Sequence, residues 1–412
     1  MRGGTVAVVG GSIAGCAFAA AAARAGADEV VVLERTRGRL ADRGLGLCVH
    51  DERAAELTAA GTLPAGITAH RLERRRWVVR DPGAETGAGR GAGDGGRLVW
   101  EQPFPFHSYH WGLLWRGLRA ATPESVVYRQ GATVTGVTGG GDGAVLRLAG
   151  GAVERYDLAV GADGYRSVVR EALCPGARPH YAGYVCWRGN LDAARQAAAG
   201  DADPFPEAVT TVCFPGGSCV IYRIPGPDGP RVNWVLYAAP PQDGRLRLDD
   251  PTSFPPGALT QELSTHLRAL LEREFPAYWG RVLALTDPAD TFVQPIYDLE
   301  TTWNAGGRLL LAGDAATVVR PHNTSGAAKA LQDAAAFAAA WRRADSWDGL
   351  LRDYREARGA AGRELVALAR RLGRAQVERT PPWPAMTPAE VAAWWQTQLA
   401  GAPGIGGRAM TP

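Results

Sequence analysis

Apolar residues near the start of the chain form two short runs on either side of a segment of small residues. Residues 5–10 (TVAVVG) and 29–34 (EVVVLE) are almost entirely apolar and have the length of strands. Residues 12–26 (SIAGCAFAAAAARAG) have the length and alanine content of a helix and end at Gly26. Strands that are apolar on both faces are typical of parallel sheets. The pattern therefore predicts a strand–helix–strand unit with parallel strands.

The turn between the first strand and the helix has the spacing of a dinucleotide-binding fingerprint. Gly10, Ser12 and Gly15 occupy its three positions, with Ser12 where a second glycine is usual. Serine keeps close approach of a pyrophosphate feasible, and Glu34 ends the second strand, where a carboxylate accepts from a ribose hydroxyl. These features favour dinucleotide binding over the alternative, a glycine-rich turn that only permits tight helix packing.

Two later strands also deliver an acid at their carboxyl ends. Residues 157–170 (DLAVGADGYRSVVR) place Asp163 after an apolar run, and residues 309–341 place Gly313 and Asp314 after another, before a polar loop and an alanine-rich helix. Backbone amides at such a helix start bind polar ligands. Two strand-end acids and a dinucleotide turn exceed what a simple NAD-dependent dehydrogenase needs.

Size and charge narrow the class of protein. A chain of 412 residues with 46% hydrophobic residues predicts two cooperating domains. The net charge is only +3 and the densest basic cluster is RLERRRW at 71–77, so nucleic acid is not an expected partner. The six cysteines form no C-x-x-C pair, which predicts reduced thiols in a cytoplasmic protein without structural zinc or another metal site.

The apolar N-terminus raises the alternative of a signal peptide. Only Arg2 precedes it, glycines interrupt it, and a second strand-like run follows directly, so we favour a retained structural element. No other stretch reaches the roughly 18 apolar residues of a membrane span.

Three motifs in this order carry a resemblance to a known family. They are GGSIAG at 10–15, GADGYRS at 161–167 and GDAATVVRPHNTSG at 313–326. Together they resemble the FAD-dependent aromatic hydroxylases, single-component flavoprotein monooxygenases related to p-hydroxybenzoate hydroxylase. YAGYVCWRG at 181–189 and FVQPIYDLE at 292–300 are similar to the 2,6-dihydroxypyridine 3-hydroxylase-like branch. The resemblance extends to about residue 375.

The resemblance implies FAD as cofactor and assigns residues to it. The pyrophosphate would lie against Gly10, Ser12, Ile13, Ala14 and Gly15, with Glu34 at the adenosine ribose and Arg35 and Arg43 beside the phosphates. The flavin half would contact Gly46, Asp163, Gly313, Asp314, Gly326, Ala327 and Ala328. Within that half, Asp314 would bind the ribityl chain, Asp163 would assist nicotinamide approach, and the amides of 326–328 would face the pyrimidine edge, where the helix dipole stabilises negative charge.

One position departs from the family pattern. Trp111 stands where many relatives have arginine at the start of a helix, so a cationic contact to FAD is lost and the indole is expected only to pack. The motif of flavin-dependent halogenases and a second nucleotide fingerprint are both absent from the sequence.

The resemblance also implies the chemistry. NADH or NADPH would reduce FAD, and O2 would then give a C4a-hydroperoxide that transfers oxygen to an electron-rich aromatic ring. Removal of a ring-hydroxyl proton activates such a ring, and His322, beside Pro321, is the candidate base because histidine titrates near neutral pH. His322 could instead only order the loop. Arg320 could bind an anionic substrate group, although a surface ion pair is favoured.

The expected substrate pocket lies on later strands. Tyr222, Arg223, Tyr237 and Gln294 are the candidates, although each residue type is more often part of a core or sheet surface. The resemblance implies a hydroxypyridine or phenol as substrate, and the apolar faces of these strands suit a mostly apolar pocket that could also take an attached hydrophobic element.

The expected fold class is α/β, with a Rossmann-type FAD-binding domain, a mainly β-sheet substrate domain and C-terminal helices. The FAD-binding domain takes residues 1–70, 100–175 and 283–375; the substrate domain takes 71–99 and 176–282; the tail is 376–412. Residues 82–96 are expected to be a hairpin tip, and residues 350–377 one amphipathic helix. Trp394 and Trp395 mark the tail as a docked cap or a contact in a homo-oligomer, with a substrate lid as the weaker alternative.

Two other functions stay open at this point. The same scaffold could perform Baeyer–Villiger insertion or epoxidation, because a fold does not choose a reaction. A non-catalytic FAD-binding protein is the second alternative.

Overall fold

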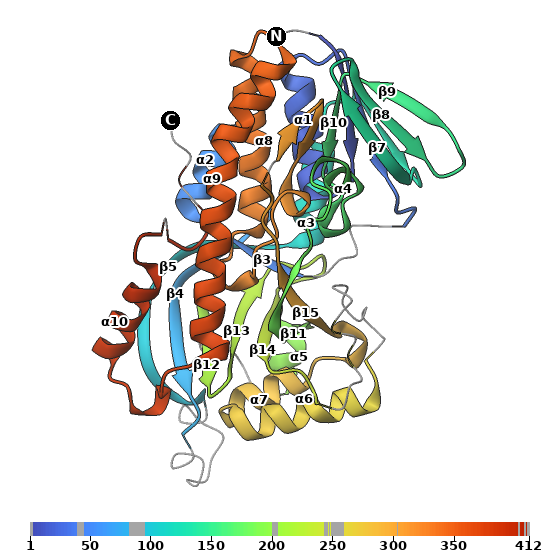
Figure 1. The fold of residues 1–412 in the computed structure, drawn as a ribbon. Helices are drawn as coiled ribbons and strands as arrows, with labels where there is room; N and C mark the ends of the chain where they lie inside the picture. The colour runs from blue at the N-terminus through green and yellow to red at the C-terminus, as the bar shows by residue number, and fades with distance from the viewer. Residues whose placement is uncertain are drawn as a thin grey trace.

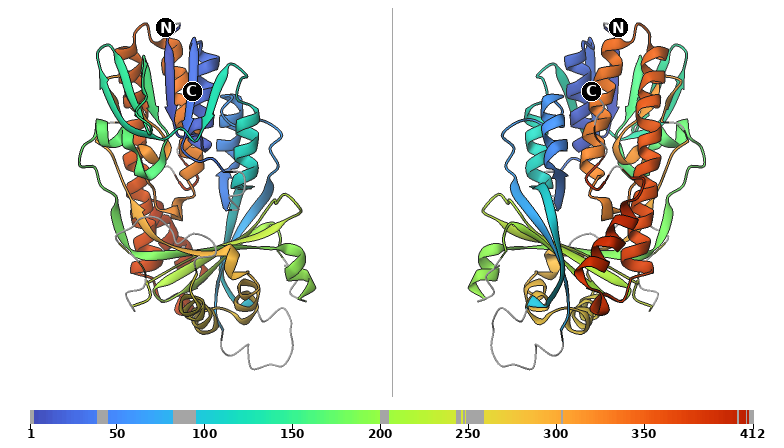
Figure 2. Two further views of the ribbon diagram at one scale, coloured as in Figure 1. Left: turned by 90° about the vertical axis from the view of Figure 1, so that its right-hand side faces the viewer. Right: turned by 90° about the vertical axis from the view of Figure 1, so that its left-hand side faces the viewer.

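The computed structural model describes residues 3–38, 45–81, 95–199, 205–242, 259–302, 304–402 and 404–407, with the single residues 246, 248 and 409. Of the expected hairpin tip, 82–94 lie outside these residues, as does Arg43. Two large sheets lie one above the other, and a long C-terminal helix runs along both (Figures 1 and 2).

The upper sheet contains the strand–helix–strand unit expected from the sequence. Its central strand pairs in parallel with strands on both sides. The helix α1 (Ile13–Ala25) connects two of these strands and ends at Gly26, whose φ of 103° is the left-handed conformation that favours glycine. In spatial order the strands are β16 (Ala305–Gly306), β17 (Leu309–Leu311), β10 (Leu158–Gly161), β1 (Thr5–Val9), β2 (Glu29–Glu34) and β6 (Val126–Gln130).

Both faces of this sheet are covered. The helices α1 and α8 (Gly326–Arg343) pack on one face, where Val6 and Val8 are buried. A small antiparallel sheet of β7 (Val134–Gly140), β8 (Gly143–Leu148) and β9 (Val153–Tyr156) packs on the other. This double coverage explains why the strands are apolar throughout.

The lower sheet has eight strands, and all its neighbouring pairs are antiparallel except β12 with β4. One face packs against α6 (Gln261–Glu274) and α7 (Ala277–Ala284). The other face is turned toward the upper sheet (Figure 2). In spatial order the strands are β15 (Thr291–Asp298), β11 (His180–Asp192), β14 (Arg231–Ala238), β13 (Gly217–Ile224), β12 (Ala208–Phe214), β4 (His70–Val79), β5 (Arg97–His110) and β3 (Gly46–His50).

Three strands differ from the ranges expected for the two domains. Strands β3, β15 and the second half of β5 belong to the lower sheet, although residues 1–70, 100–175 and 283–375 were expected to form the FAD-binding part. The reason is pairing: β3 hydrogen-bonds to β5 at one edge, and β15 to β11 at the other. Backbone pairing between segments far apart in sequence leaves no local pattern.

The C-terminal region contains the long amphipathic helix that the sequence predicts. Helix α9 (Trp347–Gly373) continues into a π-helical turn, η8 (Arg374–Glu378). The tail helix α10 (Pro388–Leu399) then docks by Trp395, whose ring lies 5.3 Å from that of Trp77 on β4. The tail therefore docks on strand β4 of its own chain.

The remaining helices are short. They are α2 (Asp51–Ala59), α3 (Trp111–Ala120), α4 (Val168–Leu173) and α5 (Ala193–Ala198), with 3-10 turns at Gly164–Arg166, Pro288–Asp290, Gly313–Ala315, Pro321–Asn323 and Trp383–Ala385. In the described part of the chain, every helix is too short or too polar to cross a membrane.

Candidate active site

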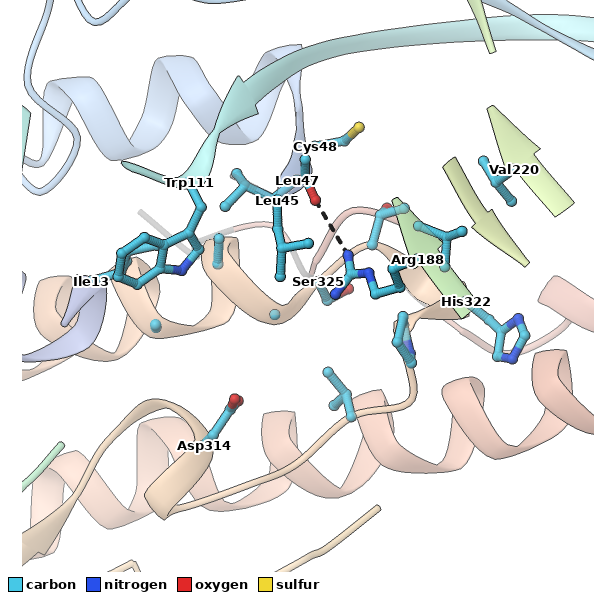
Figure 3. A pocket seen from close by; sticks show the side chains of 18 of the residues that line it. Ile13, Leu45, Leu47, Cys48, Trp111, Arg188, Val220, Asp314, His322 and Ser325 are labelled. Carbon is cyan, nitrogen blue, oxygen red and sulfur yellow. Dashed lines mark hydrogen bonds between the residues drawn. The ribbon is translucent and has the colours of Figure 1, made fainter. Parts of the chain in front are cut away.

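A cavity of about 380 Å³ lies between the two sheets. Figure 3 shows it bounded by helix starts on one side and by strands of the lower sheet on the other. We call these the amide wall and the sheet wall. The amide wall consists of Ser12, Ile13, Ala14, Ala162, Gly164, Gly313, Asp314, Gly326 and Ala327, and the sheet wall of Cys48, Arg75, Phe104, Arg188, Val209, Val220, Tyr222, Val235 and Tyr237.

The amide wall is built from the starts of α1 and α8. Neither helix has a side-chain cap at its N-terminus, whereas α4, α6, α9 and α10 are capped by Ser or Thr side chains. The first amides of α1 and α8 therefore keep their donors available, and the helix dipoles add positive potential. Ala328 follows in the same first turn but is fully buried and does not line the cavity.

Close packing behind the wall explains the glycine spacing. A Cβ on Gly15 would lie 1.9 Å from the carbonyl oxygen of Gly10, and a Cβ on Gly10 would lie 2.4 Å from that of Ala162. The turn is also held by its own contacts, since the Gly11 carbonyl accepts from Trp115 Nε1 at 2.8 Å and from Tyr128 Oη at 2.7 Å. Gly10 and Gly15 thus shape the site without lining it.

Glu34 contacts the turn directly. Its two carboxylate oxygens accept from the amides of Gly11 and Thr36, each at 2.7 Å. Arg35 is exposed beside it, and Gly46 lines the cavity from β3. Ribose binding by Glu34 and phosphate binding by Arg35 stay predictions.

The two strand-end acids differ in environment. Asp314 lines the cavity with an exposed carboxylate, 3.4 Å from the buried Lys329 ammonium. Asp163 is next to the lining residues Ala162 and Gly164, and burial raises its pKa. Its Oδ2 accepts from the Val168 amide at 2.8 Å, while its Oδ1 is buried without a hydrogen bond. Asp314 thus presents its carboxylate to the cavity, whereas the Oδ1 of Asp163 is buried beside it.

A strained loop carries Pro321 and His322 into the cavity. Thr324 has a φ of 52°, which is unusual for a β-branched residue and indicates backbone strain. The fully buried Asn323 fixes this conformation, because its Nδ2 donates to the Leu365 carbonyl on α9 at 3.1 Å.

His322 lies against two tyrosines. Its Nε2 is 2.8 Å from Tyr184 Oη, and its ring centroid is 4.1 Å from that of Tyr237. Burial, with the nearby charges of Arg320 and Arg75, lowers the pKa of His322 to about 3. The imidazole is therefore neutral at working pH, in contrast to the near-neutral titration expected from residue type alone.

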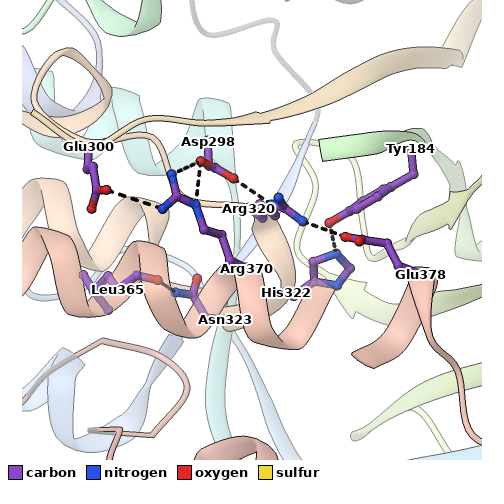
Figure 4. Close-up of polar contacts among 9 residues, drawn as sticks. All are labelled: Tyr184, Asp298, Glu300, Arg320, His322, Asn323, Leu365, Arg370 and Glu378. Carbon is purple, nitrogen blue, oxygen red and sulfur yellow. Dashed lines mark hydrogen bonds and ion pairs between the residues drawn. The ribbon is translucent and has the colours of Figure 1, made fainter. Parts of the chain in front are cut away.

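Arg320 is placed behind His322 and is not among the residues that line the cavity. Its Nε donates to Asp298 at 2.8 Å and its Nη1 to Glu378 at 3.1 Å (Figure 4). Arg370 donates to the other oxygen of Asp298 at 2.6 Å. The ion pair anticipated for Arg320 is present, but it is buried and not at the surface. The carboxylates of Asp298 and Glu378 already neutralise this guanidinium.

The sheet wall contains two of the four residues expected on the substrate side. Tyr222 and Tyr237 line the cavity. Arg223 and Gln294 do not: Arg223 follows Tyr222 on β13, points to the opposite face and donates to Gln196. Side chains alternate along a strand, so neighbours cannot share a face.

Several polar residues of the cavity were missed by the sequence analysis, among them Arg75, Arg188 and Gln376. Figure 3 shows the Arg188 side chain within the cavity, and its Nη2 donates to the Gly46 carbonyl at 3.5 Å. Gln376 had a recognisable pattern, because it follows Leu368 and Leu372 at four-residue intervals on the buried face of a helix. Trp111 also lines the cavity in addition to packing.

Comparison with known proteins agrees with this geometry. A family model described as FAD binding domain-like matches residues 181–298. A 3-amino-4-hydroxybenzoate 2-monooxygenase of Streptomyces platensis is 30% identical over 385 residues, which cover 89% of this chain and 87% of the relative. The chain belongs to the FAD-dependent aromatic hydroxylases.

Other relatives of this hydroxylase lie in the expected branch. A 2,6-dihydroxypyridine 3-monooxygenase of Paenarthrobacter nicotinovorans is 29% identical, with 85% of each chain covered. The solved structure of 2,6-dihydroxypyridine-3-hydroxylase from Arthrobacter nicotinovorans superposes with a TM-score of 0.79 at 26% identity, covering 93% of this chain and 96% of that one.

The residues of the hydroxylase fit its FAD cofactor. Two uncapped helix starts, the cradle at Gly10 and Gly15, and the open carboxylate of Asp314 are suited to an anionic pyrophosphate, a flavin edge and ribityl hydroxyls. Gly326 leaves free space where a Cβ would stand, since no protein atom lies within 4 Å of that position.

Proposed function

We propose that this hydroxylase uses NADH or NADPH as reductant and inserts one atom of O2 into a carbon of a hydroxypyridine or phenol, ortho or para to the ring hydroxyl. The observation that carries the proposal is the arrangement of the cavity. Its amide wall suits the flavin, and the neutral pair of His322 and Tyr184 lies at the same cavity.

The bound reduced flavin would supply the activation of O2, and the chain supplies position and proton control. The amides of Gly326 and Ala327 would hold the pyrimidine edge, and Asp314 would hold the ribityl chain. Apolar side chains from the sheet wall, including Val209, Val220 and Val235, exclude water.

His322 relays the ring-hydroxyl proton and does not keep it, because an imidazole whose pKa is about 3 is too weak a base to hold a proton taken from a phenol. Because its imidazole is neutral, one ring nitrogen can accept while the other bears hydrogen. The Tyr184 hydroxyl bound to Nε2 keeps the ring oriented and can pass a proton onward. The stacked Tyr237 restricts the imidazole plane.

The relatives suggest two substrate types. One acts on 2,6-dihydroxypyridine and another on 3-amino-4-hydroxybenzoate, as their names state. Both rings are electron-rich and carry a hydroxyl group, which is the property that an electrophilic oxygen transfer requires.

The test is a screen of phenols and hydroxypyridines for stimulated NAD(P)H oxidation by the FAD-loaded protein. An active ring should give a product heavier by one oxygen atom, labelled when the reaction is run under ¹⁸O2. Label from water, an epoxide, or ring expansion to a lactone would contradict hydroxylation. Bound FAD without any stimulated oxidation would favour a non-catalytic flavoprotein.

A further inference from the structure

We infer that the substrate of this hydroxylase carries a carboxylate, bound by Arg75 of β4 and Gln376 of the π-helical turn η8. This inference rests on the proposed function and specifies its substrate class as a hydroxylated aromatic acid. Four features of the sheet wall support it.

The first is the absence of an acid beside Arg75. The residue is only 5% exposed, yet its hydrogen bonds in the described chain are to neutral groups. Its Nε donates to Thr211 Oγ1 at 2.8 Å, and one terminal nitrogen reaches Gln376 Oε1 at 3.5 Å. A buried cation without a counter-charge is costly, so a ligand that supplies the charge binds favourably.

The second is the state of Arg75. Burial lowers the pKa of its guanidinium to about 10, so it stays charged at neutral pH. Among the described residues that line the cavity, Asp314 is the single carboxylate, and it belongs to the amide wall, where Lys329 is its partner. The sheet wall is therefore cationic.

The third is a second donor beside Arg75. Gln376 is 1% exposed and lines the cavity, and its Nε2 is buried without a hydrogen bond. A guanidinium fork and an amide N–H are suited to the two oxygens of a carboxylate. The π-helical turn that carries Gln376 is a local irregularity of a kind common at functional sites.

The fourth is the fixed position of the guanidinium. It lies 4.1 Å from the ring centroid of Trp77 and 5.4 Å from that of Trp395. The two indoles restrict its movement and attract its charge. The docked tail thus contributes to the substrate site through Trp395.

Arg188 is the competing cation, and it is less suited to the role. Its guanidinium already donates to the Gly46 carbonyl and is only partly buried, so its charge is less in need of a ligand, although its Nε is buried without a hydrogen bond. We therefore assign the carboxylate to Arg75 and keep Arg188 as a variant in the test.

The test measures binding to the FAD-loaded protein by the change in flavin absorbance, which does not depend on turnover. Two pairs of probes differ by a carboxylate: 3-amino-4-hydroxybenzoate with 2-aminophenol, and 2,6-dihydroxypyridine-4-carboxylate with 2,6-dihydroxypyridine. We expect the acid to bind at least about 30-fold more tightly in one or both pairs. Arg75→Met should abolish this preference, and Gln376→Leu should reduce it several-fold.

Arg74→Met is the matched control, because Arg74 lies on the same strand, is exposed, and pairs with Glu101 at 3.6 Å outside the cavity. It should keep the preference. If Arg75→Met does not fold, Arg75→Lys keeps the charge without the fork and should retain a weakened preference.

Three results would overturn the inference while leaving hydroxylation intact. The acid and the neutral ring could bind equally tightly, or the preference for the acid could survive Arg75→Met. The third result is a preference for the acid that only Arg188→Met abolishes. If no probe perturbs the flavin and no phenol or hydroxypyridine stimulates NAD(P)H oxidation, the proposed function itself fails, and the inference fails with it.

Discussion

The two walls of the cavity present different groups to a ligand. The amide wall presents backbone groups of small residues such as Ser12, Ala14 and Gly326, whereas the sheet wall presents long side chains such as Arg75 and Tyr237. Backbone recognition depends on the absence of side-chain atoms. Side-chain recognition depends on particular functional groups, which can be exchanged without moving the backbone. A substitution in the first wall should therefore act by steric conflict, and one in the second by loss of a contact.

The largest effect is expected for Gly15→Ala, behind the amide wall. The added Cβ would lie 1.9 Å from the Gly10 carbonyl oxygen, so the turn must move. We expect a loss of about 3 kcal/mol or more in the free energy of unfolding, together with loss of FAD. Urea unfolding and FAD content measure both.

Gly359→Ala is the control for that change. This glycine lies within α9, and a Cβ there meets only the flexible end of Arg363 at 3.7 Å. It should keep FAD and gain slightly in stability. Equal behaviour of the two variants would show that close packing at Gly15 is unimportant.

His322→Ala tests the proton step where the two walls meet. We expect hydroxylation to fall by about 10²-fold, because the relay that carries the ring-hydroxyl proton away is lost. FAD content should be unchanged, since the amides of α8 remain. Product formation per NAD(P)H consumed is the measurement. Unchanged coupled turnover across pH would leave His322 with only a role in ordering the loop.

Asp314→Ala removes the one carboxylate of the amide wall. Loss of a charge-assisted hydrogen bond to the ribityl chain should weaken FAD binding by about 1.5 to 3 kcal/mol. Titration of the apoprotein with FAD, followed by flavin fluorescence, gives the affinity. Asp142→Ala, in the exposed turn between β7 and β8, should bind FAD as the unmodified protein does. Equal affinities would remove Asp314 from the FAD site.

The smallest expected effect is a pH dependence of stability. The folded-state pKa of His322, about 3, lies below the value of about 6.5 for an unfolded imidazole. The unfolded chain therefore binds a proton as the pH falls below 6.5 while the folded chain does not, so stability decreases on acidification. Between pH 6.5 and 5.5 this contribution is about 1 kcal/mol.

His322→Asn should lack that contribution. Urea unfolding of both proteins at the two pH values provides the comparison, and the variant should show the smaller decrease. An identical decrease in both proteins would mean that His322 is protonated in the folded state.

The amide wall could be predicted from the sequence because its parts are local. Gly10, Ser12 and Gly15 lie within six residues, and the apolar runs around them determine a strand and a helix without reference to the rest of the chain. Asp314 and Gly326 likewise flank a single loop. The resemblance to a family then supplied the cofactor, and the comparisons confirmed the family.

Apart from Tyr222 and Tyr237, the sheet wall was decided by the tertiary structure. Arg75 lies in a run of arginines, and such a run by itself predicts a solvated surface. Its burial follows from the pairing of β4 with β12, which lies more than 130 residues later in the chain. The neutral state of His322 follows from burial against Tyr184 and Tyr237, which belong to other strands. Backbone spacing is a property of neighbouring residues and can be recognised in a sequence. Burial and charge compensation are properties of the packed chain, because they depend on which distant segments exclude water from a group.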